Sequence, residues 1–340
     1  MSWHVFSDSD GGWDQIIQSL VPHTPFQGSQ WANFRAAEGW SPLRLVSANK
    51  QCAIQFLVKE TRGLLVIGWA AGGPVGQLSP ELAVTLSQVF RHQFPLRVVY
   101  LRLSDFHKSE LTSSALYELA GWRRCLHQLS NGSTLIRNLI PGDESIRDLY
   151  SSNWSRNLRR GEQRGVRFEQ WKTPDFVEMA HIYQEVIDLK QSFEADWRTS
   201  PVALEQFHSH FGTNLVLVRA LDAQNRTLSY RAAYVLNNFG YDMLAGTSLE
   251  GRKCYASHVA THGLLCTLAE QGCQTYDFGG VDKHSNLGVF NFKHGAGGLE
   301  HSYVGEFQTA FPRIVLALLE RVMRFNQARR QAPQLAGSND

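Results

Sequence analysis

Residues that could take part in a reaction occur together between Tyr276 and Gly298, in the stretch YDFGGVDKHSNLGVFNFKHGAGG. Its first residues indicate the end of a β-strand, and two glycine clusters follow. Glycine lets a backbone come close to a ligand because it has no Cβ atom. Lys293 lies between Phe292 and His294 in this run. We interpret Lys293 as a functional residue of a glycine-rich loop rather than as a surface lysine.

A second candidate is a basic helix in the stretch NWSRNLRRGEQRGVRFE, residues 153–169. Arg156, Arg160 and Arg164 are spaced four residues apart and therefore share one helical face, which Arg159 flanks. Trp154 and Leu158 form a narrow apolar face that can dock on the protein. Guanidinium groups match phosphate oxygens, so the pattern predicts a phosphate-binding face. The alternative is a solvated charged helix.

Composition describes an ordinary globular protein of two domains, because the chain has 340 residues, 43% of them hydrophobic and 19% charged. A net charge of +2 gives no global basic field, so any nucleic-acid site must be local. No apolar stretch reaches the roughly 20 residues of a membrane span, and the N-terminus lacks the features of a secretory signal. The sequence therefore predicts a cytoplasmic protein without stable membrane insertion.

Metal binding is not expected. The five cysteines form no CxxC pair, which favours free thiols in a reducing compartment over disulfides or zinc ligands. His258 and His262 lie four residues apart on a predicted helix, but no HExxH motif or suitably spaced acid accompanies them.

The elements that position these residues fall into two halves. In the first half, strands are predicted at 42–48, 52–60, 63–70, 97–104 and 133–140, and helices at 79–94 and 113–120. In the second half, strands are predicted at 166–171, 214–221, 227–237, 241–248, 274–280 and 299–307, and helices at 174–190, 201–211, 255–270 and 312–330.

This order is compatible with an α+β fold of two fused domains of the N-acetyltransferase (GNAT) type, with mixed sheets flanked by helices. The predicted domains are residues 1–145 and 146–330, and residues 331–340 are expected to form a disordered tail. No sequence repeat is visible, so the duplication is inferred from the order of elements.

Four stretches, in order, resemble motifs of the FemAB/FemX-type aminoacyltransferase family. The basic helix resembles the signature R-x-N-[IL]-x-x-A-x-x-x-G-V, with Gly161 in place of the usual alanine. PFQGSQWANFRAAEGW resembles an N-terminal F-x-Q-[ST]-x-x-W motif, and GGPVG resembles a turn after a buried strand. YDFGGV…LGVFNFKHGAGG resembles the family's YDFGG…FKxGFGG. The resemblance extends over nearly the whole chain and indicates the family rather than the substrate.

The resemblance implies transfer of an aminoacyl group from a charged tRNA to an amine, typically on a peptidoglycan precursor. When the amine attacks the ester carbonyl, an oxyanion develops that a cation can stabilise. The family places the lysine of its FK pair there, which is Lys293 in this chain. Phe292 is then expected to wall the site and exclude water. Asp277 and Gly279 are expected to shape the strand end, and the arginine face to hold tRNA.

Three residues stand at or resemble acceptor-binding positions of the family. Arg198 begins an R-x-x-x-Y pair whose tyrosine is replaced here by Val202. Arg35 stands where a lysine that contacts the precursor's phosphates is often found. Tyr241 resembles an aromatic residue lining the groove, with a core tyrosine as the alternative. Val202 and Ala296, in AGG instead of FGG, suggest another acceptor, such as a small peptide, an amino-sugar product or a secondary metabolite.

Two other functions stay open. An acyl-CoA-dependent N-acyltransferase would bind pyrophosphate before the helix at 255–270. Gly251, Arg252 and Lys253 make a poor version of the usual multi-glycine loop, which favours tRNA as the co-substrate and no bound cofactor. The other is a non-catalytic module that binds nucleic acid or polysaccharide, against which the retention of Lys293 argues. The amino acid carried, the acceptor and the oligomeric state stay open.

Overall fold

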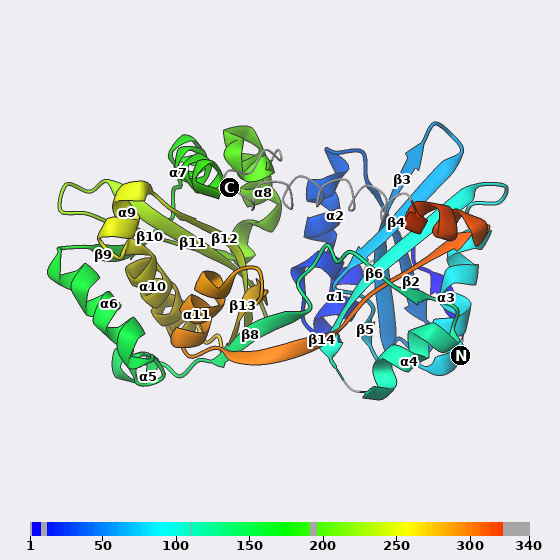
Figure 1. Cartoon of the computed structure of the whole chain (residues 1–340), viewed down its shortest axis with the longest axis horizontal. Helices are drawn as coiled ribbons and strands as arrows, with labels where there is room; N and C mark the ends of the chain where they lie inside the picture. Colours follow the sequence, from blue (N-terminus) through cyan, green and yellow to red (C-terminus); the bar gives the residue numbers. More distant parts are fainter. Residues whose placement is uncertain (1, 8–11, 110, 191–195, 322–340) are drawn as a thin grey trace, which may run out of the picture. The chain divides into compact units, whose positions relative to one another are not determined.

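The structure is a computed structural model, and it describes residues 2–7, 12–109, 111–190 and 196–321. These residues form two compact units (Figure 1). The first unit contains the described residues of 1–22, 26–130 and 303–321, and the second contains 23–25 and 131–302. The expected boundary between 145 and 146 differs from this division. The predicted tail at 331–340, and the predicted last helix beyond residue 321, lie outside the described residues.

The first unit is built on one sheet with the strand order β1-β2-β3-β4-β6-β14, to which β5 is added beside β3 and β7 beside β14. Its strands are β1 (Trp3–Val5), β2 (Ser41–Ser47), β3 (Cys52–Thr61), β4 (Leu65–Ala71), β5 (Val75–Gly76), β6 (Val98–Lys108), β7 (Arg123–Arg124) and most of β14 (Leu299–Phe311). Its helices are α1 (Trp13–Ser19), α2 (Ser29–Ala36), α3 (Pro80–His92), α4 (Leu111–Leu119) and a helix over 314–321, and the 3₁₀ turn η2 (Pro25–Gln27) precedes α2.

Two helices of the first unit, α3 and α4, form where the sequence predicts them, whereas α1 and α2 were not predicted. The side chain of Ser79 caps α3 by accepting from the backbone N–H of Leu82, and Pro80 occupies the first turn. Leu82, Leu86 and Phe90 of α3 then lie in one core cluster with residues of β3, β4 and β6. This periodicity of apolar residues explains why the helix packs on the sheet.

The second unit has the strand order β14-β8-β13-β12-β11-β10-β9, with only the first residues of β14 taking part. Its other strands are β8 (Ser133–Asn138), β9 (Arg167–Gln170), β10 (Leu215–Leu221), β11 (Thr227–Leu236), β12 (Phe239–Thr247) and β13 (Thr275–Val281). Its helices are α5 (Asp143–Asp148), α6 (Ser152–Gln163), α7 (Phe176–Lys190), α8 (Pro201–Phe211), α9 (Leu249–Lys253), α10 (Ala256–Glu270) and α11 (Leu287–Gly295), with 3₁₀ turns η3 (Trp197–Thr199) and η4 (Gly212–Asn214).

Successive side chains of a strand point to opposite faces of the sheet, and in the second unit helices pack on both faces. Val216, Val218 and Ala220 of β10 belong to the core cluster that contains α10 and the apolar side of α6. On the opposite face, Phe211 of α8 meets Tyr234 of β11 edge to face at 5.3 Å. Figure 1 shows α6, α10 and α11 on one side of this sheet and α7 and α8 on the other.

Both units contain the same order of elements, which agrees with the expected duplication. In each, three antiparallel strands lead through a helix to a parallel neighbour of the third strand: β2-β3-β4-α3-β6 in the first unit and β10-β11-β12-α10-β13 in the second. The parallel pairs differ, however. β4 and β6 pair over seven residues, whereas β12 and β13 pair over only three, ending at Tyr241 and Asp277. In the second unit the pairing of the two parallel strands therefore stops after Tyr241 and Asp277, whereas β4 is paired with β6 along its whole length.

Two strands, β8 and β14, pair in a way that their positions in the sequence did not indicate. β8, predicted to close the first half, pairs with β13 of the second unit. The first residues of β14 pair with β8, and its later residues pair with β6 and β7 of the first unit. All five cysteines are free thiols, as predicted. Among the described residues, no helix has the length and apolar character to cross a membrane.

Candidate active site

Lys293 lies in helix α11, so the prediction of a glycine-rich loop around it is wrong. The side chain of Asn286 caps this helix by accepting from the backbone N–H of Val289 at 3.3 Å. At the other end, Gly295 packs closely against Trp154 of α6, and its carbonyl accepts from the backbone of Ser151 at 2.9 Å. Capping and packing therefore outweigh the low helix propensity of glycine in this segment.

The Lys293 side chain is buried, with 8% of its surface exposed, and its ammonium group is held by backbone carbonyls. Its Nζ donates to the oxygens of Gly279 at 3.1 Å and Gly280 at 3.0 Å. An ammonium group has three N–H donors. Two are used in this way, and the third has no hydrogen-bond partner among the described residues. The helix thus presents one available donor beside the end of β13.

Asp277 and Gly279 shape this strand end as expected. Gly279 has a φ of 74°, a left-handed conformation that favours glycine. Its backbone N–H donates to the Asp277 carboxylate at 2.7 Å, and the Thr134 hydroxyl donates to the same oxygen. A register shift between β13 and β8 lies at this point. The shift directs the carbonyls of Gly279 and Gly280 toward Lys293.

Two further charged side chains lie close to Lys293, and the sequence reasoning missed both. Arg231 of β11 is 8% exposed, and its Nη1 lies 3.8 Å from the Asp242 carboxylate of β12. The Tyr276 hydroxyl donates to the same carboxylate at 2.6 Å. The sequence did contain a signal for Arg231, which is a charged residue in the apolar stretch YRAAY of a predicted strand. Such a residue is buried only when it is paired or functional.

Burial lowers the pKa of Lys293 to about 8, because the charged form loses its hydration. The neighbouring carboxylates of Asp242 and Asp277 raise this pKa, whereas the positive charge of Arg231 lowers it further. The lysine is therefore largely charged at pH 7 and becomes neutral in mildly alkaline solution.

Phe292 is half-buried and forms part of an aromatic cluster beside the lysine. Its ring lies 5.0 Å from that of His258 and 5.9 Å from that of Trp154, and the Arg231 guanidinium lies over it at 5.6 Å. Burial lowers the pKa of His258 to about 4, so its ring is neutral at pH 7. The buried Nδ1 of His258 has no hydrogen-bond partner among the described residues. These ring contacts place Phe292 in an aromatic cluster with Trp154 and His258, and its role in excluding water stays a prediction.

The arginine helix α6 docks through its apolar side and exposes its arginines, as predicted. Trp154 and Leu158 are buried, and Arg156, Arg159, Arg160 and Arg164 are exposed. Two of the arginines converge on Tyr255, which lies between α9 and α10: Arg160 donates to its hydroxyl at 3.2 Å, and the Arg164 guanidinium lies over its ring at 5.2 Å. Arg164 also donates to the carbonyl of Lys253.

These contacts join α6 to the exposed Arg252 and Lys253 of α9. We call the surface formed by Arg156, Arg159, Arg160, Arg164, Arg252 and Lys253 the basic surface. The sequence had assigned Arg252 and Lys253 to a different site. Tyr255 also meets the ring of His258 at 6.0 Å, so ring contacts lead from the basic surface to Phe292.

The segment before α10 is not an open loop of free amides. It forms α9, and the backbone N–H groups of Gly251 and Arg252 donate to the side chain and the carbonyl of Ser248. A Cβ atom on Gly251 would lie 2.3 Å from the carbonyl oxygen of Leu228. The glycine is therefore required for packing against β11, and two of the amides that could bind a pyrophosphate are already used.

The three predicted acceptor residues lie in different surroundings. Arg198, in η3 of the second unit, donates through Nε and Nη2 to both oxygens of Asp196 at 2.8 and 2.5 Å, and it stacks on Tyr183. Arg35, in α2 of the first unit, pairs with Glu38 at 2.8 Å. Burial lowers the pKa of Arg35, although Glu38 opposes the shift. Tyr241, on β12, is buried in the second unit.

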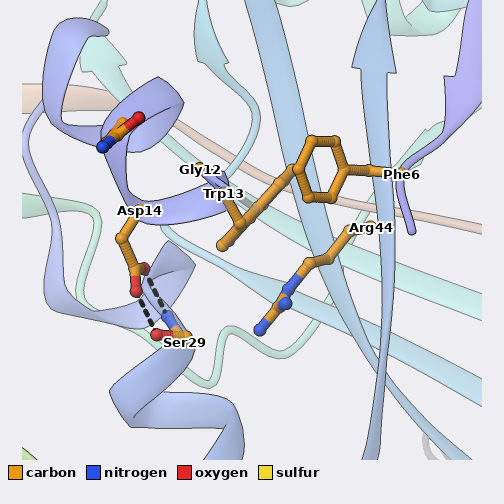
Figure 2. A pocket seen from close by; sticks show the side chains of 7 residues that line it. Phe6, Gly12, Trp13, Asp14, Ser29 and Arg44 are labelled. Carbon is orange, nitrogen blue, oxygen red and sulfur yellow. Dashed lines mark hydrogen bonds between the residues drawn. The ribbon is translucent and has the colours of Figure 1, made fainter. Parts of the chain in front are cut away.

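Two cavities are lined by described residues of the first unit. One of about 330 Å³ contains Arg44, over the ring of Trp13 at 5.3 Å, and Asp14, which accepts from the backbone of Ser29 at 2.8 Å (Figure 2). These contacts link α1, α2 and β2, and they explain the charged lining structurally.

The other cavity, of about 520 Å³, is lined by Asp105, His107 and Tyr117. The Asp105 carboxylate accepts from the Tyr117 hydroxyl at 2.7 Å and lies 2.7 Å from the His107 ring. Burial opposes the charge of His107, but Asp105 raises its pKa overall. Among the described residues, no group of three His, Cys, Asp or Glu side chains is arranged to hold a metal ion.

Comparisons with known proteins place the fold. Residues 150–294 match the family profile described as an acetyltransferase (GNAT) domain. This segment contains β12, β13, Lys293 and the basic surface. Among curated protein sequences, no significant match was found.

Solved structures with similar folds include that of FemX, with 15% identity, a TM-score of 0.75, and coverage of 91% of this chain and 97% of FemX. A C-terminal domain of a putative lysylphosphatidylglycerol synthetase from Agrobacterium fabrum has 13% identity, a TM-score of 0.53, and coverage of 89% and 92%. A tandem GNAT protein from the clavulanic acid biosynthesis pathway has 11% identity, a TM-score of 0.53, and coverage of 91% and 98%. These structures show the fold, and the match of residues 150–294 to a GNAT domain supports an acyltransferase.

Proposed function

We propose, on the premise that this chain is a tandem GNAT protein with the FemX-like fold, that it is an aminoacyltransferase. It transfers an aminoacyl group from a charged tRNA to an amine of a peptidoglycan precursor, a small peptide or a metabolite. One observation carries the proposal: the Lys293 ammonium keeps one N–H available at the point where β12 and β13 separate.

The chemistry requires little beyond position and charge. The acceptor nitrogen attacks the ester carbonyl carbon, a C–N bond forms, and the carbonyl oxygen becomes negative. The third N–H of Lys293 is free to donate to that oxygen. When the C–O bond to the ribose breaks, the proton lost by the amine ends on the ribose oxygen, so amide and free tRNA result. Phe292 and its aromatic neighbours limit the access of water that would hydrolyse the ester.

Surface charge and the segment before α10 both favour tRNA as the donor. The basic surface suits a phosphate backbone, since its exposed arginines offer donors in a planar fork. The contacts through Tyr255 and His258 lead from this surface to Phe292, beside the lysine. For acyl-CoA, the amides of Gly251 and Arg252 are poorly disposed because Ser248 already accepts from both. These features favour charged tRNA over acyl-CoA.

An assay with two donors tests this function. We expect purified protein to transfer label from a mixture of radiolabelled aminoacyl-tRNAs to one of several candidate amines, and expect RNase to abolish the transfer. A parallel reaction contains radiolabelled acetyl-CoA and no tRNA. Transfer from acetyl-CoA alone would contradict the donor and leave a GNAT-type N-acyltransferase, whereas tRNA binding without any transfer would indicate a binding module.

For the acceptor, we expect Arg35→Ala to raise the KM more than it lowers kcat. Arg35 retains a positive charge at its family position, and a charge that clamps phosphate or carboxylate acts in the ground state. Arg198→Ala is expected to act in the same direction but less, because Asp196 accepts from both Nε and Nη2 of Arg198. Arg35, by contrast, pairs with Glu38 through Nη2, and its Nε has no hydrogen-bond partner among the described residues. Steady-state kinetics with varied acceptor measure both. An unchanged KM for both variants would show that the acceptor binds elsewhere.

A further inference from the structure

Three charged side chains, from α11, β12 and β11, lie near the register shift of β13 at Gly279. A Cβ atom on Gly279 would lie 3.9 Å from Lys293 Nζ and 3.9 Å from Asp242 Cβ, so the lysine and the aspartate both lie close to this point. Arg231 lies on β11, the strand that pairs with β12, and its Nη1 is 3.8 Å from the Asp242 carboxylate. All three side chains are largely buried.

The Arg231–Asp242 pair has an unusual geometry for a structural ion pair. At 3.8 Å it is too long for a hydrogen bond, and the buried Nη1 has no hydrogen-bond partner among the described residues. Asp242 instead accepts from the Tyr276 hydroxyl. A buried ion pair is weak as a device for stability, since apolar residues of similar size commonly replace one without loss. Stability alone therefore does not account for these two charges, and both lie close enough to affect the charge of Lys293.

We propose that Arg231 and Asp242 are positioning residues that act through Lys293. They change the proton affinity of its amine in opposite directions. The aspartate favours the ammonium form, and the arginine opposes it. This deepens the function proposed above, on which its catalytic meaning rests, because an ammonium that stabilises an oxyanion must be charged when the acceptor amine attacks.

The other charged and titratable groups around Lys293 leave this pair as the adjustable one. On β13, Asp277 also favours the ammonium form, but its carboxylate is tied to Thr134 and to the backbone of Gly279. Tyr276 stays protonated because burial raises its pKa well above the usual value. The nearby face of α6 presents neutral Trp154. The negative charge of Asp242 raises the pKa of Lys293, and the positive charge of Arg231 lowers it.

The experiment measures the titration midpoint of Lys293 directly. The chain has eight lysines, so protein labelled with 13C at the lysine ε-carbon gives a small set of NMR signals, and Lys293→Met identifies the signal of Lys293. Titration between pH 6 and 11, values chosen to bracket its pKa of about 8, gives its midpoint. We expect Asp242→Asn to lower this midpoint and Arg231→Met to raise it, each by roughly one pH unit, a tenfold change in proton affinity.

Controls separate this effect from general damage. Arg231→Lys keeps the charge and should preserve the midpoint. Arg219→Met removes an arginine from neighbouring β10, where it pairs with Glu169, and should also leave the midpoint unchanged. Lys283, exposed and paired with Glu300, is the internal reference in each spectrum.

Midpoints that stay fixed, or that move in the same direction in Asp242→Asn and Arg231→Met, would overturn the proposal. If Arg231→Met does not fold, Asp242→Asn decides, since the amide is isosteric and only a lowered midpoint supports the proposal. The result is independent of transfer: opposite shifts without transfer from aminoacyl-tRNA would retain the role of the pair and reject the proposed function. With transfer, the alkaline limb of the single-turnover rate should move with the midpoint.

Discussion

Lys293→Met is expected to lower the rate of aminoacyl transfer by about 10² to 10³-fold, the effect typical of removing a donor to an oxyanion. Methionine keeps most of the apolar stem in its buried position but supplies no N–H. Because the interaction forms mainly in the transition state, the affinity for the acceptor should change little. Single-turnover transfer with pre-bound aminoacyl-tRNA measures the rate, and steady-state kinetics measure the KM.

The structure adds a requirement to this test, since Lys293 also donates to the carbonyls of Gly279 and Gly280. Loss of these two hydrogen bonds costs about 1–3 kcal/mol of stability, so a melting curve must accompany the rate measurements. Lys293→Arg should restore the rate only in part, because a planar guanidinium cannot occupy the place of a compact ammonium. Lys283→Met, in the same segment but exposed, is the matched control and should react normally. A folded Lys293→Met enzyme with the rate of the unaltered protein would assign the lysine to structure alone.

Reversing the charge of Arg156, Arg160 and Arg164 to glutamate should weaken the binding of tRNA by orders of magnitude at low salt. Each phosphate contact contributes roughly 0.7 to 0.9 to the slope of log K against log salt. Losing three should therefore flatten this slope by about 2 to 3. Filter binding of tRNA over a series of KCl concentrations measures both quantities. The three arginines are exposed, so the helix should persist in circular dichroism.

The matched control reverses three exposed arginines of the first unit, Arg91, Arg97 and Arg123, which changes the net charge equally. This control should lower tRNA affinity much less and leave most of the slope. If the α6 variant and the control bind tRNA equally well, net charge rather than the basic surface accounts for the interaction. A further reversal of Arg252 and Lys253 should add to the effect of the α6 variant, because contacts through Tyr255 and Arg164 join α9 to α6.

Much of the fold follows from local patterns. The cap formed by Ser79 and Pro80, the helix ended near Glu270 and the docking of Trp154 and Leu158 were all predicted, because capping and apolar periodicity act over a few neighbouring residues. The helix around Lys293 was not predicted. Its stability depends on packing against α6, and two glycines in the local sequence point away from a helix.

The sequence by itself determined the family resemblance, the duplicated order of elements, the exposed arginines of α6 and the importance of Lys293 as a candidate. All of these are properties of residue type and spacing along the chain. Tertiary structure alone decided that β8 and the start of β14 pair within the second unit, and that β12 and β13 pair over only three residues. It alone brought Arg231 and Asp242 beside Lys293. Strand pairing and charge clusters join residues far apart in the sequence, so no local pattern records them.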